Sequence, residues 1–254
     1  MAAVVSTEQR DGVQIVTINR PEARNAVNRA VAEGIAAAMD ELDAREDLVV
    51  GVITGAGGTF CAGMDLKAFV AGEVVTIPGR GFAGLCSNPP TKPLIAAVEG
   101  WALAGGCEIA LTCPLIVAAE TAKFGIPEVK RSLVAGAGGL LRLPRRIPPA
   151  IAYELALTGD PLTAEVAHRH GLVNQLVPEG GALEGALALA ARITPNGPLA
   201  LTATKQILDF ATEHNVEEGW SYQGPLLPPV FTSNDAREGA IAFAEKRAPK
   251  WTGS

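Results

Sequence analysis

The residues of this sequence that could do chemistry are two carboxylates and two glycine-rich turns. Gly105 and Gly106 open an apolar-periodic segment, Cys107 to Cys113, that is typical of a helix ended by Pro114. Glycines at a helix start leave N–H groups uncovered by any Cβ, and the positive helix end favours charge on an approaching oxygen. Glu108 lies three residues after Gly105 and therefore on the same helix face. An anion-stabilising amide beside a carboxylate could form catalytic machinery, although these residues equally suit a structural strand-turn-helix corner.

Two further segments carry similar features. The segment TFCAGMDL, residues 59–66, places small residues before a second helix start, where another backbone N–H could be free. Asp65 can cap that helix. The segment FGIPE, residues 124–128, places Glu128 after a proline turn in apolar company. Taken singly, each segment also suits a purely structural role.

Other chemistries fit the sequence poorly. The segment GRGFAG, residues 79–84, matches the dinucleotide pattern G-x-G-x-x-G, but only residues 82–88 remain for the helix that must follow before Pro89. The sequence has no G-x-S-x-G motif of a serine hydrolase. His168 and His170 lie two apart on an expected helix and point to different faces. The sequence therefore predicts no metal site.

Composition sets the broad class. A chain of 254 residues with 48% hydrophobic residues can bury a sizeable core as one large domain, or one domain with an appendage. A net charge of −6 argues against a nucleic-acid-binding surface. The four cysteines show no metal or redox spacing, which is typical of free thiols in a reducing cytosol. With no expected signal peptide or membrane span, the sequence predicts a soluble cytoplasmic protein.

The apolar patterns predict an α/β core followed by a helical segment. Strands are expected at 4–7, 13–18, 48–54, 94–98, 115–118 and 172–177. Helices are expected at 28–44, 65–70, 150–157, 163–169, 183–193, 199–213, 215–223 and 235–247. Residues 71–90 are irregular, and 132–139 form a glycine-rich bend. The turn PNGP at 195–198 divides an expected core, 1–195, from an expected oligomerisation segment, 196–254.

Taken together, these motifs resemble the crotonase (enoyl-CoA hydratase/isomerase) family. The resemblance is carried by FCAGMDL, KPLIAAVEGWALAGGCEIAL and KFGIPEV in this order, and by the opening NRP and RNA motifs at 19–21 and 24–26. It implies a spiral of ββα turns with a helical C-terminal trimerisation segment, assembled as trimers or dimers of trimers. Pro114 departs from the pattern, because the family usually has an aspartate there.

The resemblance also implies roles for individual residues. The backbone amides of Met64 and Gly105 would bind the thioester oxygen of an acyl-CoA, and Glu108 and Glu128 would act as acid and base. The Gly136 amide would help to place the catalytic water. Coenzyme A would be part of the substrate, with no separate cofactor and no metal. Residues expected along the CoA path are Arg24, Ala26, Ala62, Asp65 and Leu66.

The expected reaction is reversible syn addition of water to a 2-enoyl-CoA, giving a 3-hydroxyacyl-CoA. Glu108, in the first turn of its helix, suits the base, because the helix dipole favours its ionised form. Apolar neighbours of Glu128 favour the protonated acid, although Lys130 and Arg131 could oppose this. A delta-isomerase needing only Glu128, a dehydratase of another 3-hydroxyacyl-CoA, and a non-catalytic acyl-CoA-binding or RNA-binding protein remain as alternatives.

Overall fold

The computed structural model describes residues 3–254 and has a six-stranded sheet at its centre. The strand order is β1-β2-β3-β6-β8-β11. Strands β1 and β2 form an antiparallel hairpin, and every other neighbouring pair is parallel. Parallel pairing requires crossovers, and helices supply them here. The strands are β1 (Val5–Arg10), β2 (Val13–Ile18), β3 (Val50–Gly55), β6 (Leu94–Val98), β8 (Leu115–Ala119) and β11 (Gln175–Val177).

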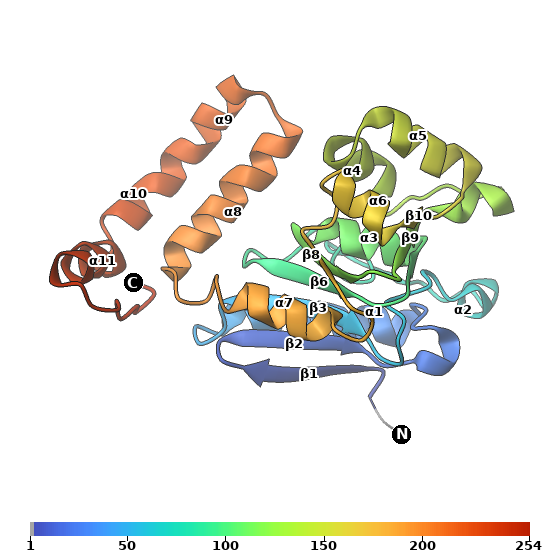
Figure 1. The fold of residues 1–254 in the computed structure, drawn as a ribbon, viewed down its shortest axis with the longest axis horizontal. Coiled ribbons are helices and arrows are strands. Elements are labelled where there is room, and N and C mark those ends of the chain that lie inside the picture. Colours follow the sequence, from blue (N-terminus) through green and yellow to red (C-terminus); the bar gives the residue numbers. More distant parts are fainter. Residues whose placement is uncertain (1–2) are drawn as a thin grey trace.

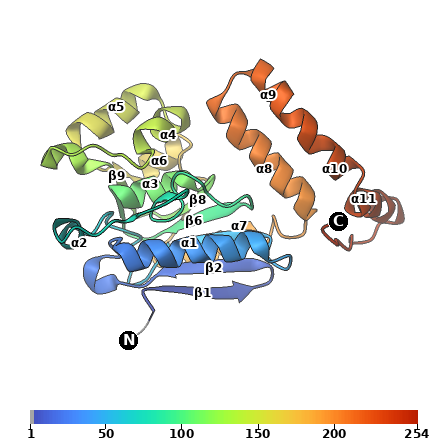
Figure 2. The same cartoon turned by 180° about the vertical axis from the view of Figure 1, so that it is seen from behind.

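Helices α1 (Arg29–Ala44) and α7 (Ala182–Ala190) cover opposite faces of this sheet (Figures 1 and 2). The alternation along β6 explains this arrangement, since successive side chains point to opposite faces. Ile95 packs in the cluster that contains the alanines of α7, whereas Ala96 packs in the cluster that contains the apolar residues of α1. The core therefore has two layers of side chains, one on each side of the sheet.

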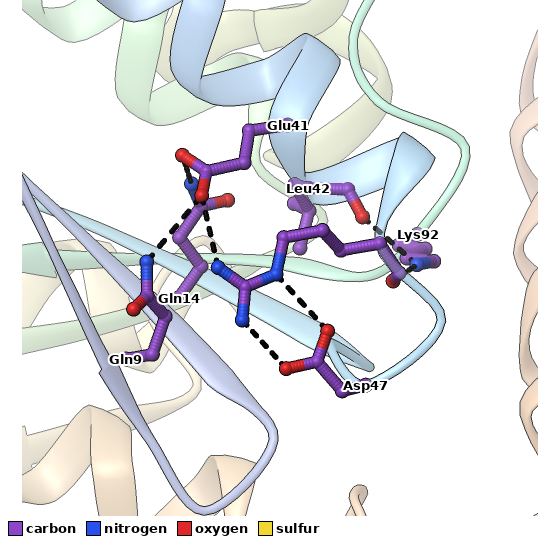
Figure 3. Close-up of polar contacts among 7 residues, drawn as sticks. Gln9, Gln14, Glu41, Leu42, Asp47 and Lys92 are labelled. Carbon is purple, nitrogen blue, oxygen red and sulfur yellow. Dashed lines mark hydrogen bonds and ion pairs between the residues drawn. The ribbon is translucent and has the colours of Figure 1, made fainter.

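A polar network fixes the C-terminal end of α1 against the hairpin. The Glu41 carboxylate accepts hydrogen bonds from Gln9 at 3.4 Å and from the fully buried Gln14 at 3.1 Å (Figure 3). Lys92 donates to the carbonyls of Leu42 and Arg45, where a cation complements the negative helix end. These contacts set the position of α1 and of the chain that enters β6.

Two smaller groups of strands and several short helices complete the core. Strands β7 (Trp101–Leu103), β9 (Lys123–Gly125) and β10 (Leu162–Thr163) form a second sheet, and β4 (Thr76–Ile77) with β5 (Gly81–Phe82) forms a hairpin. The G-x-G-x-x-G segment lies in this hairpin, and the next element is a strand. The remaining helices of the core are η1 (Pro21–Ala23), α2 (Leu66–Val70), α3 (Gly105–Thr112), η2 (Pro127–Arg131), α4 (Gly139–Arg146), α5 (Pro149–Thr158) and α6 (Ala164–Arg169).

The C-terminal helices project from one side of the core (Figure 1). They are α8 (Pro198–Glu213), α9 (Val216–Gln223), η3 (Gly224–Leu226), α10 (Leu227–Phe231) and α11 (Asn234–Glu245). Phe210 of α8 stacks on Tyr222 of α9 with ring centroids 4.0 Å apart. The expected boundary at residue 195 falls between α7 and α8, and the division into two units stays a prediction. In residues 3–254, no helix is both long and apolar enough to cross a bilayer.

Candidate active site

Helix α3 starts from a strained residue. Ala104 has φ 50° and ψ −128°, and its N–H donates to the Gly125 carbonyl at 2.8 Å. A non-glycine residue in such a conformation costs about 1–3 kcal/mol and is typical of functional sites. The helix begins at Gly105, two residues before the expected start at Cys107. The Gly105 N–H, the first of the helix, meets no acceptor among residues 3–254.

The Met64 amide is left free by the way its neighbours pair. Val27 donates to the Gly63 carbonyl at 2.8 Å, and Asp65 donates to the Val27 carbonyl at 2.9 Å. In such a parallel bridge the intervening residue turns its own N–H to the other side. The Met64 N–H accordingly has no acceptor within the described chain.

The two free amides belong to segments in direct contact. A Cβ added to Gly63 would lie 2.9 Å from the Gly105 nitrogen. Cys61 and Ala102 form a parallel bridge that aligns the two turns. The structure therefore brings together the residues that the sequence predicts for an oxyanion hole, with one donor at a helix N-terminus.

Close packing at this turn requires glycine. A Cβ on Gly106 would lie 2.1 Å from the Cys61 carbonyl oxygen, and one on Gly105 would lie 2.4 Å from the ring of Phe82. Phe82 thus lies directly against the oxyanion turn. This neighbour was not predicted from the sequence, because Phe82 belongs to the irregular segment 71–90. The signal available in the sequence was an aromatic residue within the glycine-rich run GRGFAG.

Glu108 is held by a loop distant in sequence. Its side chain is almost fully buried, at 3% exposure, and Oε1 accepts hydrogen bonds from the N–H groups of Ala137 at 2.7 Å and Gly139 at 2.9 Å. Burial raises the pKa of Glu108, while both N–H donors and the Arg142 charge act in the opposite direction. The carboxylate is therefore fixed in place with hydrogen bonds that favour its ionised form.

Glu128 lies in a different environment. It follows Pro127 in η2, and its Oε2 is buried without a hydrogen-bond donor in residues 3–254. Burial raises the pKa of Glu128 and the Glu108 charge raises it further, whereas a hydrogen bond from the Glu128 backbone N–H and the Arg131 charge lower it. Lys130 is engaged elsewhere, with Asp160 at 2.5 Å. Burial thus raises the pKa of both carboxyl groups, but two N–H donors to Glu108 Oε1 oppose this rise, whereas Glu128 Oε2 has no such donor in residues 3–254.

Gly136 precedes the loop that holds Glu108. It is exposed, and a Cβ at this position would meet only the Val134 carbonyl, at 3.8 Å. The Glu108 carboxylate takes its two hydrogen bonds from Ala137 and Gly139 instead. The role of the Gly136 amide in placing water stays a prediction.

The residues expected along the CoA path lie next to one another. The Ala62 N–H donates to the Arg24 carbonyl at 3.0 Å, and Leu66, which is 47% exposed, begins α2. Asp65 caps that helix through the N–H groups of residues 67 and 68, as the sequence predicts.

The opening NRP motif has a structural role beside this path. Arg20 pairs with Asp65 at 3.0 Å and donates to the Ala26 carbonyl at 2.6 Å. The Asp65 side chain therefore organises the local fold, and any contact that it makes with a substrate stays a prediction.

Nearly the whole chain matches the model of a known family. The model of the enoyl-CoA hydratase/isomerase family matches residues 8–254. The chain belongs to this family. The resemblance drawn from the sequence and the crotonase-like fold class are thereby confirmed.

Individual relatives agree with this assignment. The chain is similar to a crystal structure of an enoyl-CoA hydratase from Mycobacterium tuberculosis, with 62% identity, a TM-score of 0.97 and full coverage of both chains. A second enoyl-CoA hydratase of that organism is 44% identical, over 96% of this chain and 94% of its own length. A carnitinyl-CoA dehydratase from Salmonella typhi is also 44% identical, over 94% of each chain.

Proposed function

We propose that the protein catalyses reversible syn addition of water to a 2-enoyl-CoA thioester, giving a 3-hydroxyacyl-CoA. Negative charge builds on the thioester oxygen as water adds to Cβ. The amides of Met64 and Gly105 would stabilise this charge, and loss of one such donor typically costs about 3–4 kcal/mol. Family membership and the two free amides in adjacent turns support this assignment.

The two glutamates would divide the proton transfers. Glu108 accepts a proton from water while the water oxygen bonds to Cβ, and Glu128 gives its proton to Cα. Water is thereby added across the double bond, and the proton on Glu108 returns to Glu128 through solvent before the next turnover. The single observation that supports this division is the contrast between a Glu108 oxygen with two N–H donors and a buried Glu128 oxygen with none in residues 3–254.

Steady-state hydration of crotonyl-CoA, followed by loss of the enoyl-thioester absorbance, tests the proposal. Glu108→Gln and Glu128→Gln should each lower kcat by about 10²–10⁴-fold, the usual contribution of a general acid or base. Glu179→Gln, at an exposed position in the turn between β11 and α7, is the matched control and should leave kcat unchanged. Full hydration activity in Glu128→Gln, or none in the wild-type protein with any enoyl-CoA, would overturn the proposal.

Dehydration of a 3-hydroxyacyl-CoA is the same reaction in reverse, and the carnitinyl-CoA dehydratase relative makes it the second candidate direction. An isomerase working through Glu128 alone would shift the double bond of a 3-enoyl-CoA. Glu108→Gln separates these reactions, because it should slow hydration and dehydration by that same factor but spare such isomerisation. Wild-type rates for all three substrates then rank the activities.

The C-terminal helices would assemble the protein as a homotrimer or a dimer of trimers. They carry large apolar side chains at high exposure, including Val216 at 78%, Phe231 at 72% and Phe243 at 88%. Such a concentration is typical of an interface between subunits. Light scattering after gel filtration tests the assembly, and a monomeric mass would contradict it.

A cytoplasmic location fits the four buried cysteines, which are all free thiols.

A further inference from the structure

Helix α4 carries an arginine that reaches back over the loop before it. Arg142 Nη1 donates to the Ala137 carbonyl at 3.3 Å, and Nη2 donates to the Cys86 carbonyl at 2.7 Å. Gly138, with φ 98°, lies under the guanidinium, because a Cβ there would be 2.3 Å from Nη1. One side chain therefore ties the loop at 137–139 to the segment that follows the β4–β5 hairpin.

This loop is the one that holds Glu108. Its N–H groups at Ala137 and Gly139 both donate to Glu108 Oε1, while the carbonyl of Ala137 faces the guanidinium. In the described chain, Arg142 forms no ion pair with a carboxylate within 4 Å, and its two hydrogen bonds go to carbonyls. The Arg142 charge therefore acts on the buried Glu108 and is not neutralised by a carboxylate in contact with the guanidinium.

We propose that Arg142 is a positioning residue for hydration, which holds the loop at 137–139 against Glu108 and keeps that carboxylate ionised. This inference rests on the proposed function. The bracing component acts through the two carbonyl hydrogen bonds, and the electrostatic component acts through the guanidinium charge. Each component can be removed separately by substitution.

The groups around Glu108 decide the direction of the electrostatic effect. Burial raises the pKa values of the Cys86 and Cys107 thiols to about 12, so both are neutral at working pH. The Glu108 charge raises the pKa of Glu128 on η2, and Arg131 lowers the Glu128 pKa. Within residues 3–254, Arg142 is the cation that acts on Glu108, where it lowers the pKa that burial raises. Removing its charge should therefore raise that pKa and move the acidic limb of the pH–rate profile to higher pH.

Arg146 provides a matched control. It lies one turn further along α4 and donates to the carbonyls of Leu111 and Cys113 at 3.2 and 2.8 Å, at the opposite end of α3 from the oxyanion turn. It also donates to Pro114, the position where the family usually has an aspartate. Arg146→Met should lower the free energy of unfolding, as Arg142→Met should. It should leave the pKa of Glu108 unchanged, because Arg146 is not among the charges that act on that carboxylate.

The test compares pH profiles of kcat and kcat/KM for crotonyl-CoA hydration in four variants. Arg142→Met should lower kcat about tenfold with KM little changed, and should move the acidic limb up by about one pH unit, a typical effect of losing one nearby charge. Arg142→Gln, which keeps N–H donors for the carbonyls but no charge, should recover part of kcat and leave the limb displaced. Arg142→Lys should restore the limb, and Arg146→Met should not move it.

The outcomes separate this inference from the proposed function. Absence of hydration by the wild-type protein overturns the proposed function itself. Wild-type hydration with an unmoved acidic limb in both Arg142→Met and Arg142→Gln overturns the electrostatic role of Arg142. Equal loss of kcat in Arg142→Met and Arg146→Met, with unmoved limbs, shows that both arginines only stabilise the fold. If Arg142→Met does not fold, Arg142→Gln and Arg142→Lys decide the question.

Discussion

Gly139 and Glu108, which are 31 residues apart in the chain, are joined by a hydrogen bond of 2.9 Å from the Gly139 N–H to Glu108 Oε1. A Cβ at residue 139 would lie 2.9 Å from Glu108 Cγ and 3.1 Å from Oε1. The backbone at the start of α4 therefore both binds the carboxylate and limits where it can lie. A carboxylate confined in this way is already oriented before substrate binds, which is a known source of rate enhancement.

Gly139→Ala should displace Glu108 and lower kcat for hydration by about 10²-fold, because small misplacement of a catalytic group has effects of this size. KM should change little, since the residue does not line the expected CoA path. Gly219→Ala on α9, where an added Cβ meets nothing within 4 Å, is the control for adding a methyl group to a helical glycine. Equal kcat for Gly139→Ala and the wild-type protein would contradict the confinement of Glu108.

Glu128→Gln should make the folded protein more stable at alkaline pH while it lowers kcat for hydration. Burial raises the folded-state pKa of Glu128, so its protonated form stabilises the fold below the unfolded pKa. This contribution is lost as pH rises through the folded value, because a buried carboxylate then carries charge. Glutamine avoids that charge at every pH.

Thermal unfolding at two pH values measures this effect. The Tm of Glu128→Gln should exceed that of the wild-type protein at pH 8 by about 2–4 °C per kcal/mol gained, and the difference should shrink at pH 5. Glu179→Gln, on an exposed turn, should show no such pH-dependent difference. A lower Tm for Glu128→Gln at pH 8 would mean that the carboxylate is not destabilised by burial.

The sequence allowed prediction of the elements whose signals are local. The run at 94–98 forms β6, Asn28 caps α1 and Thr163 caps α6, since these features depend on neighbouring residues alone. The two glutamates and the oxyanion turns could also be predicted, because each lies within a short motif of the sequence. The strand expected at 172–177 forms only at 175–177, because the N–H groups of Leu172 and Val173 bond to Ala167 and end α6.

Features that depend on distant partners were not predicted. Helix α4 contains Pro144, which removes one helical N–H, so the sequence pattern indicated no helix there. Strand β7 has only three residues and is defined by pairing with β9. The bonds from Ala137 and Gly139 to Glu108 arise from packing of α3 against α4, which no local pattern encodes.

Ala104→Gly should stabilise the fold and weaken catalysis. Glycine adopts the positive φ of this position freely, so strain of about 1–3 kcal/mol is released, against a cost of about 0.5–1 kcal/mol for the greater freedom of glycine in the unfolded chain. The same freedom lets the Gly105 amide move, so the oxyanion hole is less firmly preorganised and kcat should fall severalfold.

Asp11→Gly is the matched control, because Asp11 also has a positive φ, 51°, but lies in the β1–β2 turn. Thermal unfolding should show a gain for both variants, whereas hydration kinetics should show a loss for Ala104→Gly alone; a stability loss in Ala104→Gly would mean that the Ala104 methyl group contributes more by packing than its backbone costs in strain.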